Sequence, residues 1–238
     1  MVEGLYKVEY EINDGSGRSV LYAHAGKMLG GNTAFAHFGT YEIVDGEIVA
    51  RLRTKRHSRS LQHRRLVSSD AVTISIRGRQ QGKLYRFAGE VVEDASVFRA
   101  VMTPLGDDDV PPPGAIGEAG IVSGLYSIDI RMLDGIGGGH TGVMLLRDGR
   151  ILGGDAFFYY LGAYSSANGR WKGEFVNQEH TPAKSEHPLF GGYEVGIGFS
   201  GHCDDKGAEM EATALAGKRS IRLAASLKLV EPFARAGR

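Results

Sequence analysis

The densest group of chemically active side chains lies between residues 51 and 65. These fifteen residues contain seven lysines and arginines, and no acidic residue occurs from 51 to 69. A basic run of this kind can bind an acidic protein surface, a phosphate-rich ligand or nucleic acid, although the absence of aromatic residues disfavours nucleic acid. The alternative is a solvated strand end and loop, whose charge Asp107–Asp109 would offset. The candidate partner-binding residues are Arg51, Arg53, Lys55, Arg56, Arg59, Arg64 and Arg65.

The other motifs that could do chemistry are incomplete. The glycine-rich run 135–140 lacks the lysine and the helix of a phosphate loop, so we read it as a turn. Residues 202–205 (His-Cys-Asp-Asp) fall between two predicted strands and would need metal ligands from elsewhere. His57 and His180 recur at equivalent positions without a catalytic partner, which favours structural hydrogen bonds.

No catalytic constellation is visible in the sequence. It contains no nucleophile elbow, no metal-binding histidine pair at helical spacing and no paired carboxylates in a recognisable context. We therefore predict a protein that is not an enzyme, with no catalytic residue, no bound metal and no cofactor. An enzyme of unknown class is kept as an alternative, because function depends on sites and not on folds.

Length and composition narrow the class of protein. A chain of 238 residues fits two modest domains, and 28 basic against 28 acidic residues give no overall field that attracts nucleic acid or an anionic membrane. The single cysteine, Cys203, excludes an internal disulfide and a zinc finger and indicates a reducing compartment. Residues 1–7 show no secretion signal, and no apolar stretch reaches the roughly 18 residues of a membrane span. We expect a cytoplasmic protein with no membrane insertion.

Apolar and polar residues alternate along most of the chain, which is the period of a half-buried strand. In residues 6–12, for example, the apolar side chains fall on every second position. Asp45-Gly46, Asp148-Gly149 and Asn168-Gly169 are hairpin signals, and the 35 glycines also favour many tight turns. No segment shows a helical apolar stripe. The sequence therefore predicts an all-β protein.

The chain contains an internal duplication. Gly4-Leu5-Tyr6 recurs as Gly124-Leu125-Tyr126, and the segment that starts Lys27-Met28-Leu29-Gly30-Gly31-Asn32 recurs as Arg150-Ile151-Leu152-Gly153-Gly154-Asp155. His57 and His180 are separated by the same 123 residues as Lys27 and Arg150. We predict a first domain at 1–105, a Pro/Gly/Asp-rich linker at 106–123 and a second domain at 124–238.

Each copy has enough strands to close into a barrel. Seven or eight antiparallel strands joined by short turns are best closed into an up-and-down β-barrel, because closure removes the exposed edges. A β-sandwich is the alternative. A barrel of this size is either filled by its side chains or holds one small ligand. The side chains expected inside, and thus at any apolar ligand, are Tyr6, Tyr10, Tyr126, Trp171 and Phe175.

These motifs resemble the GrlR family of type III secretion regulators. In the second copy, the motifs that carry the resemblance are Gly124-Leu125-Tyr126, residues 149–155 and Gly162-Ala163-Tyr164. The first copy has the same arrangement, with Asn32 in place of Asp155. The resemblance, taken as a tandem duplication of the family, implies lipocalin-like barrels that pair as dimers, contain an apolar cavity and act as negative regulators by binding a transcriptional activator.

A tandem chain can replace such a homodimer with an internal pseudo-dimer. The linker of about 18 residues keeps the two copies at a high effective concentration. Segments 34–38 and 157–161 are apolar on both alternating faces except for His37, as expected of strands that are also covered on the outside. We therefore place Phe35, Phe158 and Tyr160 at the barrel–barrel interface and expect a monomeric chain.

Three functions are compatible with this sequence. The first is a regulatory binding protein with a protein partner such as a transcriptional regulator, which the resemblance and the basic run favour. The second is an intracellular carrier of a small apolar or lipid ligand in the barrel cavities. The third is the enzyme of unknown class.

Overall fold

In a computed structural model, the residues described are 2–58, 69–106, 111–133, 139–183, 190 and 194–233. These residues form sixteen β-strands and contain no helix. The first eight strands are β1 (Gly4–Ile12), β2 (Gly15–His24), β3 (Lys27–Gly31), β4 (Phe35–Val44), β5 (Glu47–Arg56), β6 (Ala71–Gln81), β7 (Leu84–Val91) and β8 (Ser96–Pro104). The second eight are β9 (Gly124–Met132), β10 (Gly139–Arg147), β11 (Arg150–Gly154), β12 (Phe158–Ala167), β13 (Arg170–Glu179), β14 (Val195–Cys203), β15 (Gly207–Ala216) and β16 (Arg219–Pro232).

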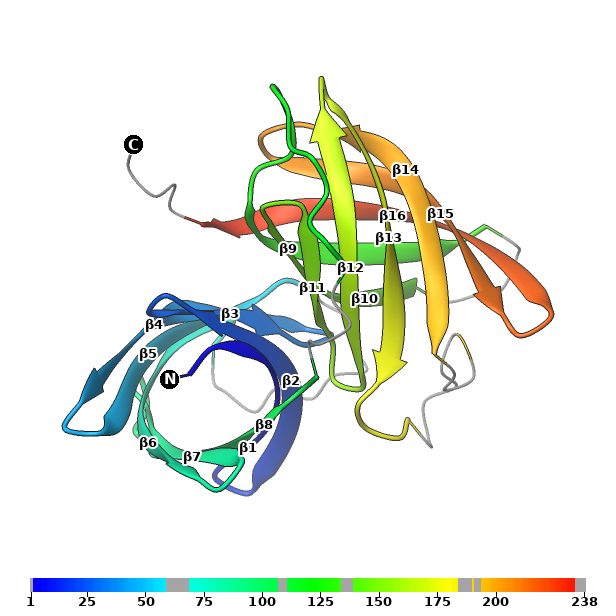
Figure 1. Ribbon diagram of the computed structural model, residues 1–238. Helices are drawn as coiled ribbons and strands as arrows, with labels where there is room; N and C mark the ends of the chain where they lie inside the picture. The colour runs from blue at the N-terminus through cyan, green and yellow to red at the C-terminus, as the bar shows by residue number, and fades with distance from the viewer. Residues whose placement is uncertain are drawn as a thin grey trace.

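The strands close into two antiparallel barrels (Figure 1). Strands β1 to β8 form one barrel in sequence order, and β9 to β16 form the other, with β16 paired to β9. The prediction of two tandem up-and-down barrels is thus confirmed, and the sandwich alternative is wrong. Closure leaves no long unpaired sheet edge among the described strands, because the first and last strands of each barrel pair with one another.

The predicted hairpins lie at chain reversals. Asp45-Gly46, Asp148-Gly149 and Asn168-Gly169 each have two successive positive φ angles, as two-residue turns between twisted strands require. The first turn of the chain falls at Asn13 and Asp14, so Gly15 already belongs to β2. These turns set the pairing register that decides which side chains point inward.

One end of each barrel is closed by the residues that precede its first strand. In the first barrel Val2 is buried in the core, and the hydroxyl of Tyr41 donates to its carbonyl oxygen at 2.5 Å. In the second barrel Ile121 is buried in the core, and the hydroxyl of Tyr126 donates to Val122 O at 2.6 Å. Both barrels therefore have one closed end. In the first barrel, the β1–β2 turn at Asn13 and Asp14 lies at the opposite end.

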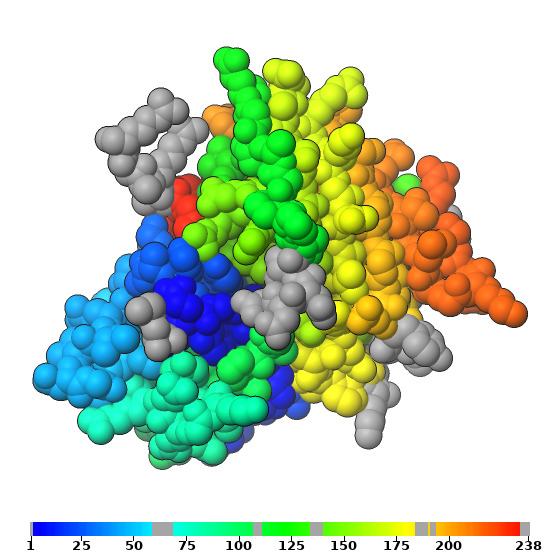
Figure 2. Space-filling view, in the orientation of Figure 1, coloured from blue at the N-terminus to red at the C-terminus, as the bar shows by residue number. Residues whose placement is uncertain are grey.

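The linker also adds an extended segment to the second barrel. Residues 115–117 lie beside the end of β12, where Gly117 N donates to Ser166 O and Ser166 N donates to Ala115 O. The two barrels lie in contact with each other (Figure 2). They pack through outward-facing side chains of β2, β3, β10 and β11. The apolar cluster between the barrels is separate from the two barrel cores. It contains the buried residues Leu5, Val20, Leu29, Ala36, Leu125, Val143, Leu145, Leu152 and Leu161. The predicted pseudo-dimer is thus present.

The prediction of which aromatic residues form this interface was wrong. Tyr160 is buried in the core of the second barrel and Phe158 packs against the same core, whereas Phe35 lines the cavity of the first barrel. The neighbouring positions Phe38, Tyr159 and Leu161 pack in the interface instead. Because successive side chains of a strand point to opposite faces, an error of one residue exchanges interior and interface.

Candidate functional site

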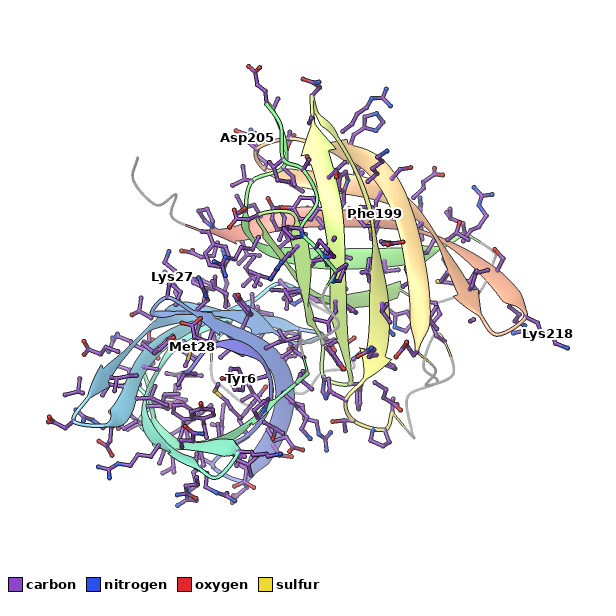
Figure 3. All side chains as sticks on the ribbon, in the orientation of Figure 1. Tyr6, Lys27, Met28, Phe199, Asp205 and Lys218 are labelled. Atoms are coloured by element: carbon purple, nitrogen blue, oxygen red, sulfur yellow. The ribbon has the colours of Figure 1, made fainter. Side chains whose placement is uncertain are left out.

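The first barrel encloses a cavity of about 460 Å³. All eight strands contribute to its wall, and the side chains of Tyr6 and Met28 lie within the ring of strands in Figure 3. The cavity lies in the range of volumes that hold small-molecule ligands. Its apolar wall includes Val8, Ile12, Leu21, Met28, Leu52, Ile74, Ile76, Phe87, Phe98, Ala100 and Met102.

The cavity extends to the end of the barrel opposite Val2. The β1–β2 turn contributes Asp14, the start of β2 contributes Gly15 to Arg18, and the β3–β4 connection contributes Thr33 and Ala34. Ala156 of the second barrel also lines the cavity. Asp14 and Arg18 are exposed, so the described charged groups of the lining lie at the mouth and not in the interior.

A cluster of neutral polar side chains interrupts the apolar wall near the mouth. His37 Nε2 lies 2.9 Å from Ser19 Oγ, and His37 Nδ1 lies 2.9 Å from Thr54 Oγ1. The amide of Asn32 donates to the hydroxyl of Tyr10 at 3.1 Å and lies 3.2 Å from Ser19 Oγ. All five residues line the cavity. We call Tyr10, Ser19, Asn32, His37 and Thr54 the polar cluster.

The polar cluster is held in place by its surroundings. Asn32 Oδ1 accepts hydrogen bonds from the backbone N–H groups of Ala34 and Phe35, both at 2.9 Å, which fixes the β3–β4 connection. The ring of Tyr10 lies over Gly17, where an added Cβ would come within 2.4 Å of the ring. Glycine at position 17 is therefore required for this orientation of the tyrosine.

His37 is uncharged at neutral pH. Burial, together with a smaller effect of the nearby His57, lowers its pKa to about 4. A neutral imidazole has one N–H donor and one acceptor nitrogen, so one hydroxyl partner donates to the ring and the other accepts from it. The interior of the cavity is thus polar at one place but carries no charge among its described residues.

The second barrel fills the corresponding space with aromatic rings. Phe175 and Phe199 occupy the positions of Leu52 and Ile76, 123 residues earlier, and Tyr160 occupies that of His37. Neighbouring ring centroids in the second barrel are 4.5 to 6.2 Å apart for Trp171–Phe199, Phe175–Phe199, Tyr160–Phe175 and Tyr164–Trp171. Phe190 adds a further ring to this core.

The second barrel also differs from the first at the position of Asn32 in the polar cluster. Asp155 replaces Asn32, and its Oδ1 accepts the backbone N–H groups of Phe157 and Phe158 at 2.7 and 2.8 Å. Burial raises the pKa of Asp155 to about 6, although these two N–H groups and Tyr160 favour the carboxylate. The offset of 123 residues pairs Asn32 with Asp155 and His37 with Tyr160, and this signal could have revealed the polar cluster in the sequence.

His57 and His180 make equivalent contacts in the two barrels. His57 Nε2 lies 3.0 Å from Asn32 O, and His180 Nε2 lies 3.4 Å from Asp155 O. Their backbone N–H groups donate to Ala34 O and Phe157 O, which are also equivalent positions. The two histidines tie the segment after β5 or β13 to the connection before β4 or β12, which is the structural use that the sequence indicated.

The predicted interior residues all face the barrel interiors. Tyr6 packs in the first core at 5.6 Å from the ring of Tyr85, and Tyr10 lines the cavity. Tyr126, Trp171 and Phe175 are buried in the core of the second barrel.

The basic run divides into an exposed and a packed part. Arg51, Arg53 and Lys55 are exposed on alternate positions of β5. Arg56 instead lies 5.8 Å from the ring centroid of Phe35 and donates from Nε to Ser58 O. The other predicted partner-binding residues, Arg59, Arg64 and Arg65, lie outside the described residues.

A second hollow, of about 1180 Å³, lies against the second barrel. It is bounded by the linker residues 115–117 and by exposed side chains of both charges, among them Asp129, Arg131 and Glu209. Asp204, which the sequence placed in a hairpin, accepts the backbone N–H groups of Lys206 and Gly207. Across the described residues, no group of three or more His, Cys, Asp or Glu side chains is arranged to hold a metal ion.

No protein-family model matches the sequence, and no curated protein matches it. Among solved structures, the chain is similar to a "putative outer membrane protein" from Bacteroides fragilis NCTC 9343, with 9% sequence identity and a TM-score of 0.25. The match covers 96% of this chain and 97% of that one. At this identity and TM-score the likeness says nothing about function. The part of the chain that is described contains no helix able to span a membrane.

Proposed function

We propose that this protein is a non-catalytic binding protein whose first barrel holds a small apolar ligand. The observation that carries the proposal is the cavity of about 460 Å³, with apolar walls from all eight strands and one polar cluster. Ligand sites in proteins are usually concave and mostly apolar, with a few polar groups that orient the ligand. As part of the same proposal we place the protein in the cytoplasm, on the ground of its single cysteine.

The two barrels have different roles in this proposal. The first provides the binding cavity, and the second, whose interior is occupied by packed aromatic rings, covers the outer face of β2 and β3. Ala156 of the second barrel lines the cavity mouth, so the docked pair presents a different entrance from that of a lone first barrel.

The sharpest test transfers the residues of the second barrel into the first. Leu52→Phe combined with Ile76→Phe introduces the rings of Phe175 and Phe199 at the matching positions and fills the cavity. The neutral fluorophore N-phenyl-1-naphthylamine brightens when it enters an apolar site, and its titration measures binding. We expect saturable binding to the wild-type protein and at least about tenfold weaker binding to the filled variant.

Val97→Phe is the matched control, because Val97 is an exposed outer-face residue of the same barrel. It should bind the fluorophore like the wild type. If the double variant does not fold, Ala100→Leu narrows the same cavity by a smaller volume and should weaken binding in the same direction. No saturable binding to the wild type, or equal binding to wild type and Ala100→Leu, would contradict the proposal.

A second candidate function is the regulatory one implied by the resemblance to the GrlR family. The observation that favours it is the row of exposed basic side chains on β5, Arg51, Arg53 and Lys55, which suits an acidic protein surface. Charge reversal of all three to Glu should abolish capture of a specific protein from cytosol. Reversal of Arg170 and Lys172, which are exposed on β13, should leave that capture unchanged. Capture that survives reversal on β5 counts against this candidate.

A further inference from the structure

We propose that the ligand of the first barrel is an uncharged aliphatic alcohol, whose hydroxyl hydrogen-bonds to the polar cluster while its hydrocarbon part fills the apolar cavity. This inference rests on the proposed function and specifies its ligand. It depends on the geometry of Tyr10, Ser19, Asn32, His37 and Thr54.

The position of charged groups argues against a charged ligand. Of the described residues that line the cavity, only Asp14 and Arg18 are charged, and both are exposed at the mouth. Arg18 Nε also lies 3.6 Å from Glu9 Oε1, so the charge of this arginine already has a partner. A carboxylate or an ammonium group drawn inside would lose its hydration without a counter-charge, which costs far more than burial of a hydroxyl.

The remaining hydrogen-bonding capacity favours a hydroxyl. Both ring nitrogens of His37 have partners, and Asn32 Oδ1 accepts two backbone N–H groups. Whichever nitrogen of His37 carries the hydrogen, Thr54 Oγ1 keeps a lone pair. The Tyr10 hydroxyl, which accepts from Asn32, still has a hydrogen to donate. Ser19 Oγ already accepts from Asn32 and contacts His37 Nε2. A ligand hydroxyl can therefore donate to Thr54 Oγ1 and accept from the Tyr10 hydroxyl. An alkane can do neither.

The hydroxyls are also fixed before a ligand arrives. Ser19 and Thr54 are 1% and 5% exposed and are bridged by His37, and Tyr10 is held over Gly17 and by Asn32. Polar groups that are already ordered cost little further entropy on binding. The cavity thus selects its ligand by one hydrogen-bonding position in an otherwise apolar space.

The experiment compares four ligands with the same chain length. Octanol, octane, octanoate and octylammonium compete for bound N-phenyl-1-naphthylamine at pH 8, using the full chain. One net hydrogen bond corresponds to about a three- to tenfold preference, which we expect for octanol over octane. We expect octanol to bind more than about tenfold more tightly than octanoate or octylammonium.

A variant with fewer hydroxyls tests the residues. Ser19→Ala combined with Thr54→Val should reduce the preference for octanol over octane to about onefold, with octane binding retained. Thr73→Val is the matched control on the adjacent strand β6; it removes a hydroxyl outside the cavity lining and should keep the preference. If the double variant does not fold, Thr54→Val alone should lower the preference.

The outcomes separate this inference from the proposed function. If none of the four compounds displaces the fluorophore, or the fluorophore itself does not bind, the apolar site is refuted and this inference with it. If octanoate or octylammonium binds as tightly as octanol, or octane does, the cavity still binds ligands but the alcohol assignment is wrong. A preference for octanol that survives in Ser19→Ala with Thr54→Val refutes the role of the polar cluster.

Discussion

Val20 of the first barrel lies directly against Gly154 of the second. A Cβ added to Gly154 would come within 2.7 Å of Val20 Cγ2, and a Cβ added to Gly31 would come within 2.9 Å of Val143 Cγ1. Val20 and Val143 are equivalent positions of the duplication, and so are Gly31 and Gly154. The contact is therefore made twice with the partners exchanged, which is the symmetry of an interface between two identical subunits. The chain has the interface of a homodimer within one polypeptide.

A charge at this contact should separate the barrels. Val143 is completely buried, so Val143→Asp would place an unpaired carboxylate in the apolar interface and should cost about 3 kcal/mol of unfolding free energy. The undocked barrels would remain joined by the linker, and the hydrodynamic radius should increase. Size-exclusion chromatography with small-angle scattering measures this change. Val97→Asp, at a position that is 49% exposed, is the control and should change neither quantity. Unchanged size and stability in Val143→Asp would refute the interface.

The polar edge of the interface should contribute as well. Arg147 of the second barrel donates to the hydroxyl of Tyr22 and to Nε2 of His24, and Nδ1 of that histidine lies 2.7 Å from Glu3 Oε2. Arg147→Met keeps much of the side-chain volume but removes both donors, and should lower the unfolding free energy by about 1 to 3 kcal/mol. Urea denaturation measures this loss. Arg150→Met, at an exposed position of β11, should cost less than about 0.5 kcal/mol. An equal effect of the two variants would show that the contacts of Arg147 do not stabilise the interface.

The barrels could be predicted because their signals are local and repeated. Period-two alternation, Asp-Gly and Asn-Gly turns and the duplication each appear within a short window of sequence. The residues of the interface were harder to predict. Around Phe158 to Leu161 both faces of the strand are apolar, so alternation identifies a covered strand but does not show which face points outward. The register of the whole barrel decides that Tyr160 points inward and Tyr159 outward.

The cavity could not be predicted from the pattern for a different reason. Whether a barrel is filled depends on the summed volumes of side chains from eight strands, and Leu52 and Phe175 are equally hydrophobic in a binary pattern. The polar cluster joins residues from β1, β2, β4, β5 and the β3–β4 connection, which only the closed barrel brings together. The basic run was visible in the sequence, but the contact of Arg56 with Phe35 depends on the pairing of β4 with β5.

Two half-buried histidines, His37 and His180, should make the protein sensitive to acid. Burial lowers the pKa of His37 and of His180 to about 4, whereas a histidine in the unfolded chain titrates near 6.5. The unfolded state therefore binds protons first as the pH falls. The stability contributed by each neutral histidine is present above about pH 6.5 and is lost between pH 6.5 and 4, by about 1 to 3 kcal/mol per residue.

Substitution of His37 tests this origin of the acid sensitivity. His37→Gln keeps a neutral donor and acceptor, so the fall in unfolding free energy between pH 7 and 4.5 should become smaller. Urea denaturation followed by circular dichroism at several pH values measures it. His202→Asn, which removes an exposed histidine, should leave the profile unchanged. Identical slopes for His37→Gln and wild type would show that this ring does not titrate as expected.

Asp155 should act in the opposite direction. Burial raises its pKa to about 6, above the usual value near 3.9 of an unfolded chain, so the folded state holds the proton more tightly. This residue therefore favours folding below about pH 4, and the advantage disappears as the pH rises to 6. At pH 7 the carboxylate of Asp155 destabilises the folded state, because the hydrogen bonds from Phe157, Phe158 and Tyr160 only partly offset its burial.

The first barrel supplies the residue that tests this balance, because Asn32 occupies the equivalent position. Asp155→Asn can still accept the N–H groups of Phe157 and Phe158, and its amide can donate to the Tyr160 hydroxyl as Asn32 donates to Tyr10. It should raise the unfolding free energy at pH 7 by about 1 to 3 kcal/mol, with a smaller gain at pH 4. The fluorescence of Trp171, which is buried in the same barrel, reports the transition in urea. The reciprocal variant Asn32→Asp should destabilise the first barrel at pH 7. A gain from Asp155→Asn that is the same at pH 4 and pH 7 would mean that its cause is packing and not the buried charge.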